Sequence, residues 1–248
     1  MDPMTGTGVR KVGDLPDLSH MSREERIATL RTRMSVIEGG AHTAPQEEAV
    51  APKGVIDVGE RLRAILPDGG LARRAVTVVG ESFQLVAYIL AQATDAGLRA
   101  GVVGWPELAF ASVDDMGGRL QRIVAVPEPG THGLHVATVL SEGLDLVVYR
   151  HASQGKRYTI PPSVARPLEA KLRSGRAAFL LSGAHIAAPA ATLEGTVTSF
   201  HGLARGSGRI TGVDINVTVQ ARGHVPQATT LTVGHTPTVS TEGTIRVV

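Results

Sequence analysis

The sequence predicts an α/β fold, with helices covering both faces of a mainly parallel sheet and an antiparallel extension near the carboxyl terminus. Two observations predict it. Short apolar runs, such as residues 144–148 and 177–181, alternate with helical segments, as is typical of parallel strands buried on both faces. After about residue 190, apolar and polar residues alternate within short segments, which is typical of antiparallel strands with one exposed face.

The composition agrees with a buried core. Of the 248 residues, 42% are hydrophobic and only 3% aromatic, so Val, Ile, Leu and Ala must build the interior. The absence of cysteine excludes disulfides, thiolate metal sites and a cysteine nucleophile. No apolar run reaches the ~20 residues that span a bilayer. The first residues also lack the apolar segment of a signal peptide. We therefore expect a soluble, cytoplasmic protein without a membrane partner.

Five segments are expected along the chain. Residues 1–20 are expected to be disordered or derived from a tag, 21–39 to form an amphipathic helix, and 40–54 to be a linker. Residues 55–234 form the core, and 235–248 a weakly ordered tail in which 244–248 can add a last strand.

The N-terminal helix carries one apolar stripe. Ser22 and Glu25 form a capping box at its start, and Gly39 and Gly40 end it. Apolar residues recur at spacings of three and four: Ile27, Leu30, Met34 and Ile37. An isolated helix of roughly 16 residues is marginal in water, so the stripe must dock, either on its own domain or on a partner or second copy.

Within the core, helices and strands are expected to alternate. A short helix over 58–66 precedes the first parallel strand. Further helices are expected over 83–96, near 113–118, and over 132–142 and 163–173. Parallel strands are expected over 75–79, 100–104, 122–126, 144–149 and 177–182. Antiparallel strands are expected around 196–198, 213–219 and 230–233.

The junction between the strand over 75–79 and the helix after it lacks a phosphate loop. In a nucleotide hydrolase, G-x-x-x-x-G-K-[ST] at this point cradles phosphate with backbone N–H groups and a lysine. Here the turn is Gly80-Glu81-Ser82, with no lysine and with a carboxylate where phosphate would lie. This favours a binding protein over an enzyme and predicts no nucleotide cofactor.

Charge is unevenly placed along the chain. Residues 1–140 hold 14 basic and 17 acidic residues (14 − 17 = −3), and residues 141–248 hold 11 and 6 (11 − 6 = +5). Seven basic residues lie within 150–176 against Glu169 alone. Such an excess can attract an anion or nucleic acid, but it is more typical of a solvated helix face beside a basic loop.

Neither a metal site nor hydrolase chemistry is predicted. The nine histidines form no H-E-x-x-H motif or compact cluster, although His132 and His135 share a helix face. Ser182-Gly183-Ala184-His185 lacks the flanking glycines of a nucleophile elbow. Trp105, the single tryptophan, either closes the edge of the core or anchors a partner.

The order of these elements resembles a RecA-type core, and more narrowly the RecA-like ImuA family, also called SulA-like, of the bacterial translesion mutasome. Three segments carry the resemblance: the tryptophan-proline segment 103–110, the stretch 114–126 that ends in a valine-rich strand, and the strand over 143–149. The resemblance covers roughly residues 22–234.

The sequence departs from an active RecA-type site at two places. The phosphate loop is absent. The strand ending at Val148 should deliver an aspartate to magnesium, and Tyr149 and Arg150 follow instead. Glu107, near the position of the RecA catalytic glutamate, is then most simply a surface or helix-capping residue. No catalytic, cofactor-binding or metal-binding residue is therefore predicted.

The resemblance implies a non-catalytic RecA-like adaptor in SOS-induced translesion synthesis. Its implied partners are an inactive Y-family polymerase subunit, a damage-inducible replicative-type polymerase, RecA, and a second copy bound through the N-terminal helix. In RecA-type proteins, loops after the later core strands hold single-stranded DNA. The corresponding residues here are Arg150, Lys156, Arg157, Arg205 and Arg209.

Two alternatives remain open from the sequence. One is a SulA-like cell-division inhibitor that binds the division GTPase. The other is a single-stranded-DNA-binding protein without ATPase activity, whose binding would depend steeply on salt.

Overall fold

The computed structural model describes residues 54–152, 158–204, 207–234 and 245–246. All of them belong to one unit, Ala51–Val248. The expected N-terminal helix, with Ile27, Leu30, Met34 and Ile37, and nearly all of the linker lie outside the described residues, as do Lys156, Arg157 and Arg205.

A nine-stranded sheet with the order β12-β11-β10-β3-β8-β6-β4-β5 forms the centre of the fold, and β13 pairs with β10. Five neighbouring pairs, from β10–β3 to β4–β5, are parallel. The pairs β10–β11, β11–β12 and β10–β13 are antiparallel. The expected α/β class, mostly parallel sheet and antiparallel C-terminal strands are therefore confirmed.

The strands of this sheet have the following bounds: β3 Val76–Val79, β4 Ala100–Val103, β5 Ile123–Val126, β6 Leu146–Arg150, β8 Ala178–Ser182, β10 Ala191–Ala204, β11 Ser207–Ala221, β12 Gln227–Gly234 and β13 Ile245–Arg246. Two small sheets pair β1 (Val55–Ile56) with β2 (Leu71–Ala72), and β7 (Tyr158–Thr159) with β9 (Ala184–His185). The sequence analysis did not predict these small sheets.

The helices are α2 (Glu60–Arg63), α3 (Phe83–Asp95), α4 (Phe110–Asp115), α5 (Gly133–Gly143) and α6 (Pro162–Ser174), with 3₁₀ turns at Pro67–Gly69, Leu120–Arg122 and Gly130–His132. Most expected bounds hold within two residues. The helix expected near 113–118 begins earlier, at Phe110, and ends before Gly117, whose φ of 84° does not continue a helix.

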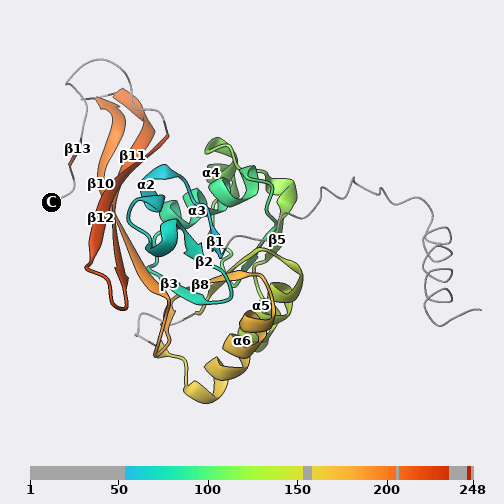
Figure 1. The fold of residues 1–248 in the computed structure, drawn as a ribbon. Coiled ribbons are helices and arrows are strands. Elements are labelled where there is room, and N and C mark those ends of the chain that lie inside the picture. The colour runs from blue at the N-terminus through green and yellow to red at the C-terminus, as the bar shows by residue number, and fades with distance from the viewer. Residues whose placement is uncertain (1–53, 153–157, 205–206, 235–244, 247–248) are drawn as a thin grey trace, which may run out of the picture. The chain divides into compact units, whose positions relative to one another are not determined.

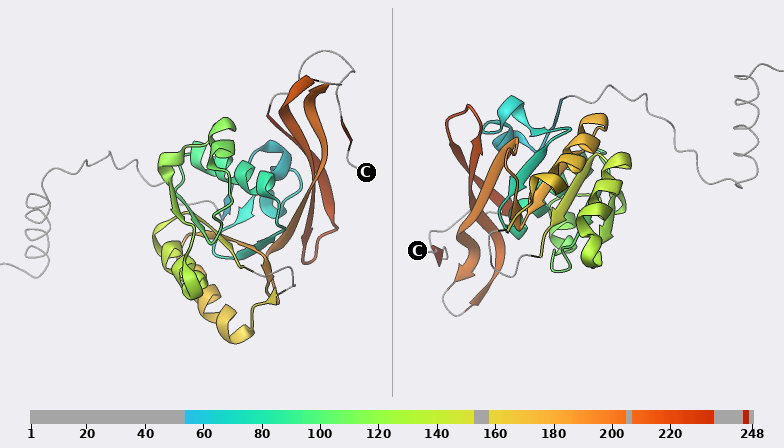
Figure 2. Two further views of the ribbon diagram at one scale, coloured as in Figure 1. Left: turned by 180° about the vertical axis from the view of Figure 1, so that it is seen from behind. Right: turned by 90° about the horizontal axis from the view of Figure 1, so that it is seen from below.

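The helices cover opposite faces of the sheet because their crossovers run in opposite directions. Through α3 and α4 the chain moves from β3 to β4 and then β5, and through α5 and α6 it returns to β6 and β8. Right-handed crossovers then place the two helix pairs on opposite faces, as Figure 1 and the views of Figure 2 show.

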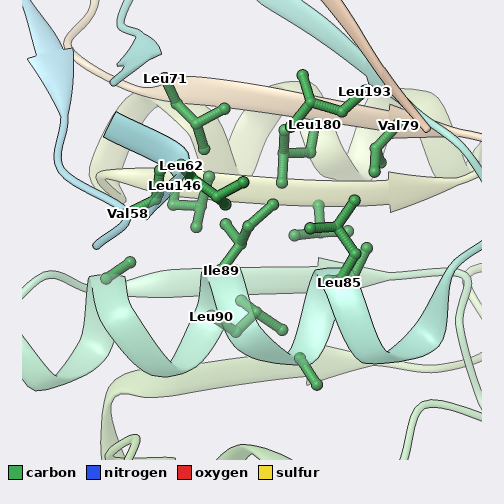
Figure 3. Close-up of a cluster of buried hydrophobic side chains, with 14 of the residues drawn as sticks. Val58, Leu62, Leu71, Val79, Leu85, Ile89, Leu90, Leu146, Leu180 and Leu193 are labelled. Carbon is green, nitrogen blue, oxygen red and sulfur yellow. The ribbon is translucent and has the colours of Figure 1, made fainter. Parts of the chain in front are cut away.

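Two hydrophobic clusters fill the space between sheet and helices. In β6, Leu146 and Val148 face the cluster under α3, while Val147 and Tyr149 face the cluster under α5 and α6. This division follows from the two-residue period of a strand. Figure 3 shows the first cluster, in which Leu85 and Ile89 of α3 lie below the sheet strands.

The antiparallel extension is much longer than the sequence pattern suggests. β10 and β11 pair from Ala191↔Ala221 to Ala204↔Ser207, with irregularities between Val197 and Ser199 and between His201 and Leu203. Extra residues at these points shift the alternation, which explains why only short strands are recognisable in the sequence. β13 lies within the segment 244–248, where a last strand was expected.

Candidate functional site at the carboxyl ends of the strands

The candidate site lies where β3, β8, β6 and β4 end side by side. The connection after β3 leaves on the α3 face, and the connection after β6 leads to α6 on the opposite face. In open α/β sheets, ligands bind in the crevice at such a switch point, outside the carboxyl ends of the strands. The turns that follow these strands therefore define the chemistry of the site.

The turn after β3 is short. The N–H of Gly80 donates to the carbonyl of Leu193 at 2.8 Å, and the N–H of Ser82 donates back to the carbonyl of Gly80 at 2.7 Å. A Cβ at position 80 would collide with the carboxylate of Glu194, so the side chain of β10 crowds this turn. The side chain of Glu81, in the same turn, is half exposed.

Arg150, at the end of β6, crosses the site. Its Nε lies 3.2 Å from Glu81 Oε1, and one terminal nitrogen lies 3.3 Å from Glu107 Oε2. The side chain of Arg150 is 22% exposed, whereas the glutamates are more than half exposed. One cation therefore links the turns after β3 and β4, and the cluster keeps one net negative charge.

The guanidinium of Arg150 lies over the ring of Trp105, which packs against Phe83. The guanidinium carbon is 5.7 Å from the centre of the Trp105 ring, within reach of a cation–π interaction. Phe83, at the start of α3, packs on Trp105 with a centroid distance of 5.4 Å. Trp105 is 1% exposed, which agrees with the alternative that it closes the core edge and not with that of an exposed anchor. Its buried Nε1 has no partner among the described residues.

Glu107 has a more specific place than the sequence indicated. It is exposed, as expected of a surface residue, yet it binds Arg150, which lies 43 positions further along the chain. No short-range pattern predicts such a pairing. The signal that existed was the position of Arg150 at the end of one parallel strand and of Glu107 four residues after another, because those ends meet at one edge of the sheet.

A second group of aromatic side chains lies beside Arg150. The hydroxyl of Tyr149 and Nδ1 of His151 are 3.2 Å apart. The ring of His151 stacks on Tyr158, with centroids 4.4 Å apart and an interplanar angle of 14°. Burial raises the pKa of Tyr149, with a smaller contribution from the charge of Tyr158. Burial also lowers the pKa of His151, which favours its neutral form.

The turns after β6 and β8 approach closely behind these rings. The N–H of His151 donates to the carbonyl of Ser182 at 2.8 Å. Gly183 has a φ of +71°, and a Cβ there would collide with the carbonyl of His151. The backbones of these two turns are therefore in direct contact.

The predicted DNA-binding residues fall in different places. Arg150 has its charge compensated by Glu81 and Glu107. Arg209 is exposed on β11 and lines a pocket of about 710 Å³ together with Gln84, Met116 and Phe200. The other three, and the four residues of the apolar stripe, lie outside the described residues.

The structure also contains a polar network that the sequence analysis missed, on the antiparallel extension. Asp214 of β11 accepts hydrogen bonds from Ser199 Oγ at 2.6 Å and Thr232 Oγ1 at 2.8 Å. His201 Nε2 lies 2.9 Å from Asp214 Oδ2. Because the aspartate lies between serine and histidine, the hydroxyl has no imidazole base, and the arrangement is not a nucleophilic triad. The irregularity after Val197 shifts the register of β10, so the sequence pattern does not show that Ser199 and His201 lie beside Asp214.

In the part of the chain that the structure describes, no three histidine or acidic side chains gather as a group able to hold a metal ion. His132 and His135 both line a pocket of about 300 Å³ between α5 and α6, without a carboxylate. Among the same residues, no helix has the length and apolar character needed to cross a membrane.

Comparison with known proteins gives two matches. Residues 64–188 match a family model described as the MT3502 N-terminal domain. The uncharacterized protein Rv3395c of Mycobacterium tuberculosis is 30% identical over 125 residues, which is 50% of this chain and 55% of the relative. The chain therefore spans about half the length of that curated relative. The matched region runs from the end of α2 past β8 and includes Glu81, Glu107 and Arg150.

Proposed function

This chain belongs to the family of the MT3502 N-terminal domain, and from that premise we propose that it is a non-catalytic, RecA-like adaptor of the ImuA type that acts in SOS-induced translesion DNA synthesis. It acts in the cytoplasm by binding other proteins. Its partners are an inactive Y-family polymerase subunit and, in the same assembly, a damage-inducible replicative-type polymerase and RecA.

The architecture supports this proposal at the level of the fold. A mainly parallel sheet covered on both faces, preceded by a short helix and followed by an antiparallel extension, is the layout that the resemblance to RecA-type cores implies. Many functions share such α/β folds, so the functional argument depends on the site.

The observation that carries the proposal is the bridge from Arg150 to Glu81 and Glu107. A nucleotide hydrolase needs a cationic cradle for phosphate and a carboxylate for magnesium at this edge of the sheet. Here two half-exposed carboxylates lie at the carboxyl edge and would repel a polyphosphate, while a guanidinium lies at the end of the strand that should carry the metal ligand. A binding role needs none of the missing groups.

A titration of the purified chain with Mg·ATP, followed by calorimetry, tests the first half of the proposal. We expect no heat of binding at concentrations where a competent RecA-type domain saturates. Saturable binding of Mg·ATP by the unaltered chain would overturn this part, and a change of its affinity in Glu81→Gln would place the nucleotide at the carboxyl edge.

Co-purification from DNA-damaged cells tests the second half. We expect tagged chain to retain the inactive Y-family subunit, and the double variant Leu30→Asp/Met34→Asp to lose it, because those residues lie on the apolar stripe. The matched control is Arg26→Asp/Arg33→Asp, which changes residues off the stripe. Retention of the subunit by the stripe variant would exclude docking through this segment.

One observation favours single-stranded DNA binding as a second candidate. The stack of His151 on Tyr158, which is 41% exposed, presents an aromatic surface, and Lys156 and Arg157 directly precede Tyr158 in the sequence. Bases stack on such surfaces, each contributing about 1–3 kcal/mol. We expect Tyr158→Ala to weaken binding of a fluorescent oligothymidine and Tyr158→Phe to preserve it; equal affinities for the two variants would exclude stacking.

A further inference from the structure

A row of arginines lies at the opposite edge of the sheet, where the parallel strands begin. Six of them precede or start neighbouring strands: Arg73 and Arg74 before β3, Arg176 before β8, Arg99 before β4, and Arg119 and Arg122 before β5. In the sheet these strands follow one another as β3, β8, β6, β4 and β5. Segments that are distant in sequence thus place their arginines along one edge.

Asp145 precedes β6 and contacts three arginines in the middle of the row. Its Oδ1 lies 3.5 Å from Arg73 and 3.4 Å from Arg176, and its Oδ2 accepts the backbone N–H of Arg99 at 3.1 Å. Arg73 also donates to the carbonyl of Arg176 at 2.8 Å. The aspartate and Arg73 are both largely buried, whereas the side chain of Arg176 is half exposed, so Asp145 and Arg73 form a buried support for the exposed arginines.

The β5 end of the row is hollowed. Arg99, Arg119 and Arg122 line a pocket of about 380 Å³ with Gln121, Val124 and Leu144. Arg119 pairs with Asp95 at 3.2 Å, and Arg122 donates to the carbonyl of Gly97 at 2.5 Å. No carboxylate is among the residues that line this pocket.

The row carries a net positive charge. Its six arginines face two carboxylates, Asp95 and Asp145, so the balance is 6 − 2 = +4. Part of this charge has a structural role, because arginines beside Gly97 and Gly143 bind carbonyls at the ends of α3 and α5. Arg74 and Arg99 are different. Both are exposed, and neither guanidinium has a partner among the described residues.

From this arrangement we propose that the amino edge of the sheet binds the phosphodiester backbone of nucleic acid. Neighbouring strands are about 4.8 Å apart, so the four steps from β3 to β5 extend the row over roughly 19 Å. Phosphates of one strand recur at about 3.4 Å along a duplex axis, which gives five or six phosphates over that length. Guanidinium groups bind phosphate oxygens in bidentate geometry, and every cation of this row is an arginine.

The chemistry of the row indicates double-stranded backbone binding without sequence readout. No aromatic side chain lines the pocket, so it offers no surface on which an unpaired base can stack. This edge is also separate from Arg150, His151 and Tyr158, which lie at the carboxyl ends of the strands. The proposal does not depend on the adaptor function.

Fluorescence anisotropy with a labelled duplex of about 20 base pairs tests the proposal. The double variant Arg74→Gln/Arg99→Gln removes the two unpaired guanidinium groups and breaks no ion pair. We expect its affinity to fall at least about tenfold at low salt, and the slope of log K against log[salt] to decrease by about two.

The matched control is Arg166→Gln/Arg222→Gln, which makes the same change in net charge at exposed positions of α6 and the β11–β12 turn. We expect it to bind as the unaltered chain does. Equal loss in both double variants would mean that only net charge matters and would overturn the site. Absence of duplex binding by the unaltered chain would also overturn the proposal. That would be the result if the arginine row bound an acidic protein and not nucleic acid.

Discussion

The ion pair between Arg150 and Glu81 joins the ends of two strands that are not neighbours in the sheet. β8 lies between β3, which precedes Glu81, and β6, which ends at Arg150. The arginine reaches across β8 and also binds Glu107 beyond β4. The charges at the carboxyl edge are therefore fixed relative to one another by one side chain, and its removal has a measurable consequence.

Changing Arg150 to Met should lower the free energy of unfolding by about 1 kcal/mol. The methionine keeps an apolar stem over Trp105 but leaves Glu81 and Glu107 close together without a cation. The effect is modest because both glutamates are more than half exposed and solvent screens them. Urea denaturation of this variant and of Arg166→Met measures it. If both variants lose the same stability, the bridge contributes nothing.

Replacing two glycines of similar backbone conformation by alanine should distinguish the stability lost to backbone strain from the stability lost to a steric collision. Gly97 (φ +87°) and Gly183 (φ +71°) both have left-handed φ values, and a Cβ at position 97 meets nothing within 4 Å. A Cβ at position 183 meets the backbone carbonyl of His151. We expect Gly97→Ala to cost about 1 kcal/mol and Gly183→Ala at least twice as much, measured by chemical denaturation.

Much of the fold could be predicted because buried parallel strands leave a local signal. Runs such as 177–181 are apolar at every position, since helices cover both faces, and β8 follows this run almost residue for residue. The antiparallel extension leaves a weaker signal. Gly195, Gly202 and two irregularities interrupt β10, so only Thr196-Val197-Thr198 indicated a strand of 14 residues.

The candidate site could be predicted only as a set of strand ends. The turn Gly80-Glu81-Ser82, which has no lysine, and the basic residue Arg150 at the end of an apolar run were visible in the sequence. The pairing of Arg150 with Glu107 was not, because it depends on which strands are neighbours. The arginine row was hidden for the same reason: its members are spread from residue 73 to residue 176 and gather only through the order of the sheet.

The pH dependence of stability should contain a contribution from His151. Burial lowers the pKa of this imidazole below its value in the unfolded chain, which is about 6.5. As the pH falls through 6.5, the unfolded chain binds the proton first, so the free energy of unfolding decreases. His151→Phe keeps the stack on Tyr158 and cannot titrate. Its loss of stability between about pH 7 and 5 should be smaller than that of the unaltered chain.

The control for this comparison is His135→Phe, at an exposed position of α5. Thermal or urea unfolding at several pH values gives the difference between variant and unaltered chain. An identical pH profile for His151→Phe and the unaltered chain would contradict the assignment.

At lower pH, Asp214 should control the acid stability of the antiparallel extension. Partial burial alone would raise the pKa of this carboxyl, but the hydrogen bonds from Ser199 and Thr232, together with the nearby imidazole of His201, outweigh it and lower the pKa below its ordinary value of 3.8. A depressed carboxyl pKa gives stability that is present above 3.8 and is lost as the pH falls through the folded-state value.

Asp214→Asn removes the charge and should cost about 1.5–3 kcal/mol at neutral pH. It should also flatten the decline of stability below pH 4, while Asp114→Asn on α4 should leave both quantities unchanged. Because β10, β11 and β12 each contribute to the network, hydrogen exchange should show the loss along all three strands. Protection lost in β11 alone would mean that Asp214 does not couple them.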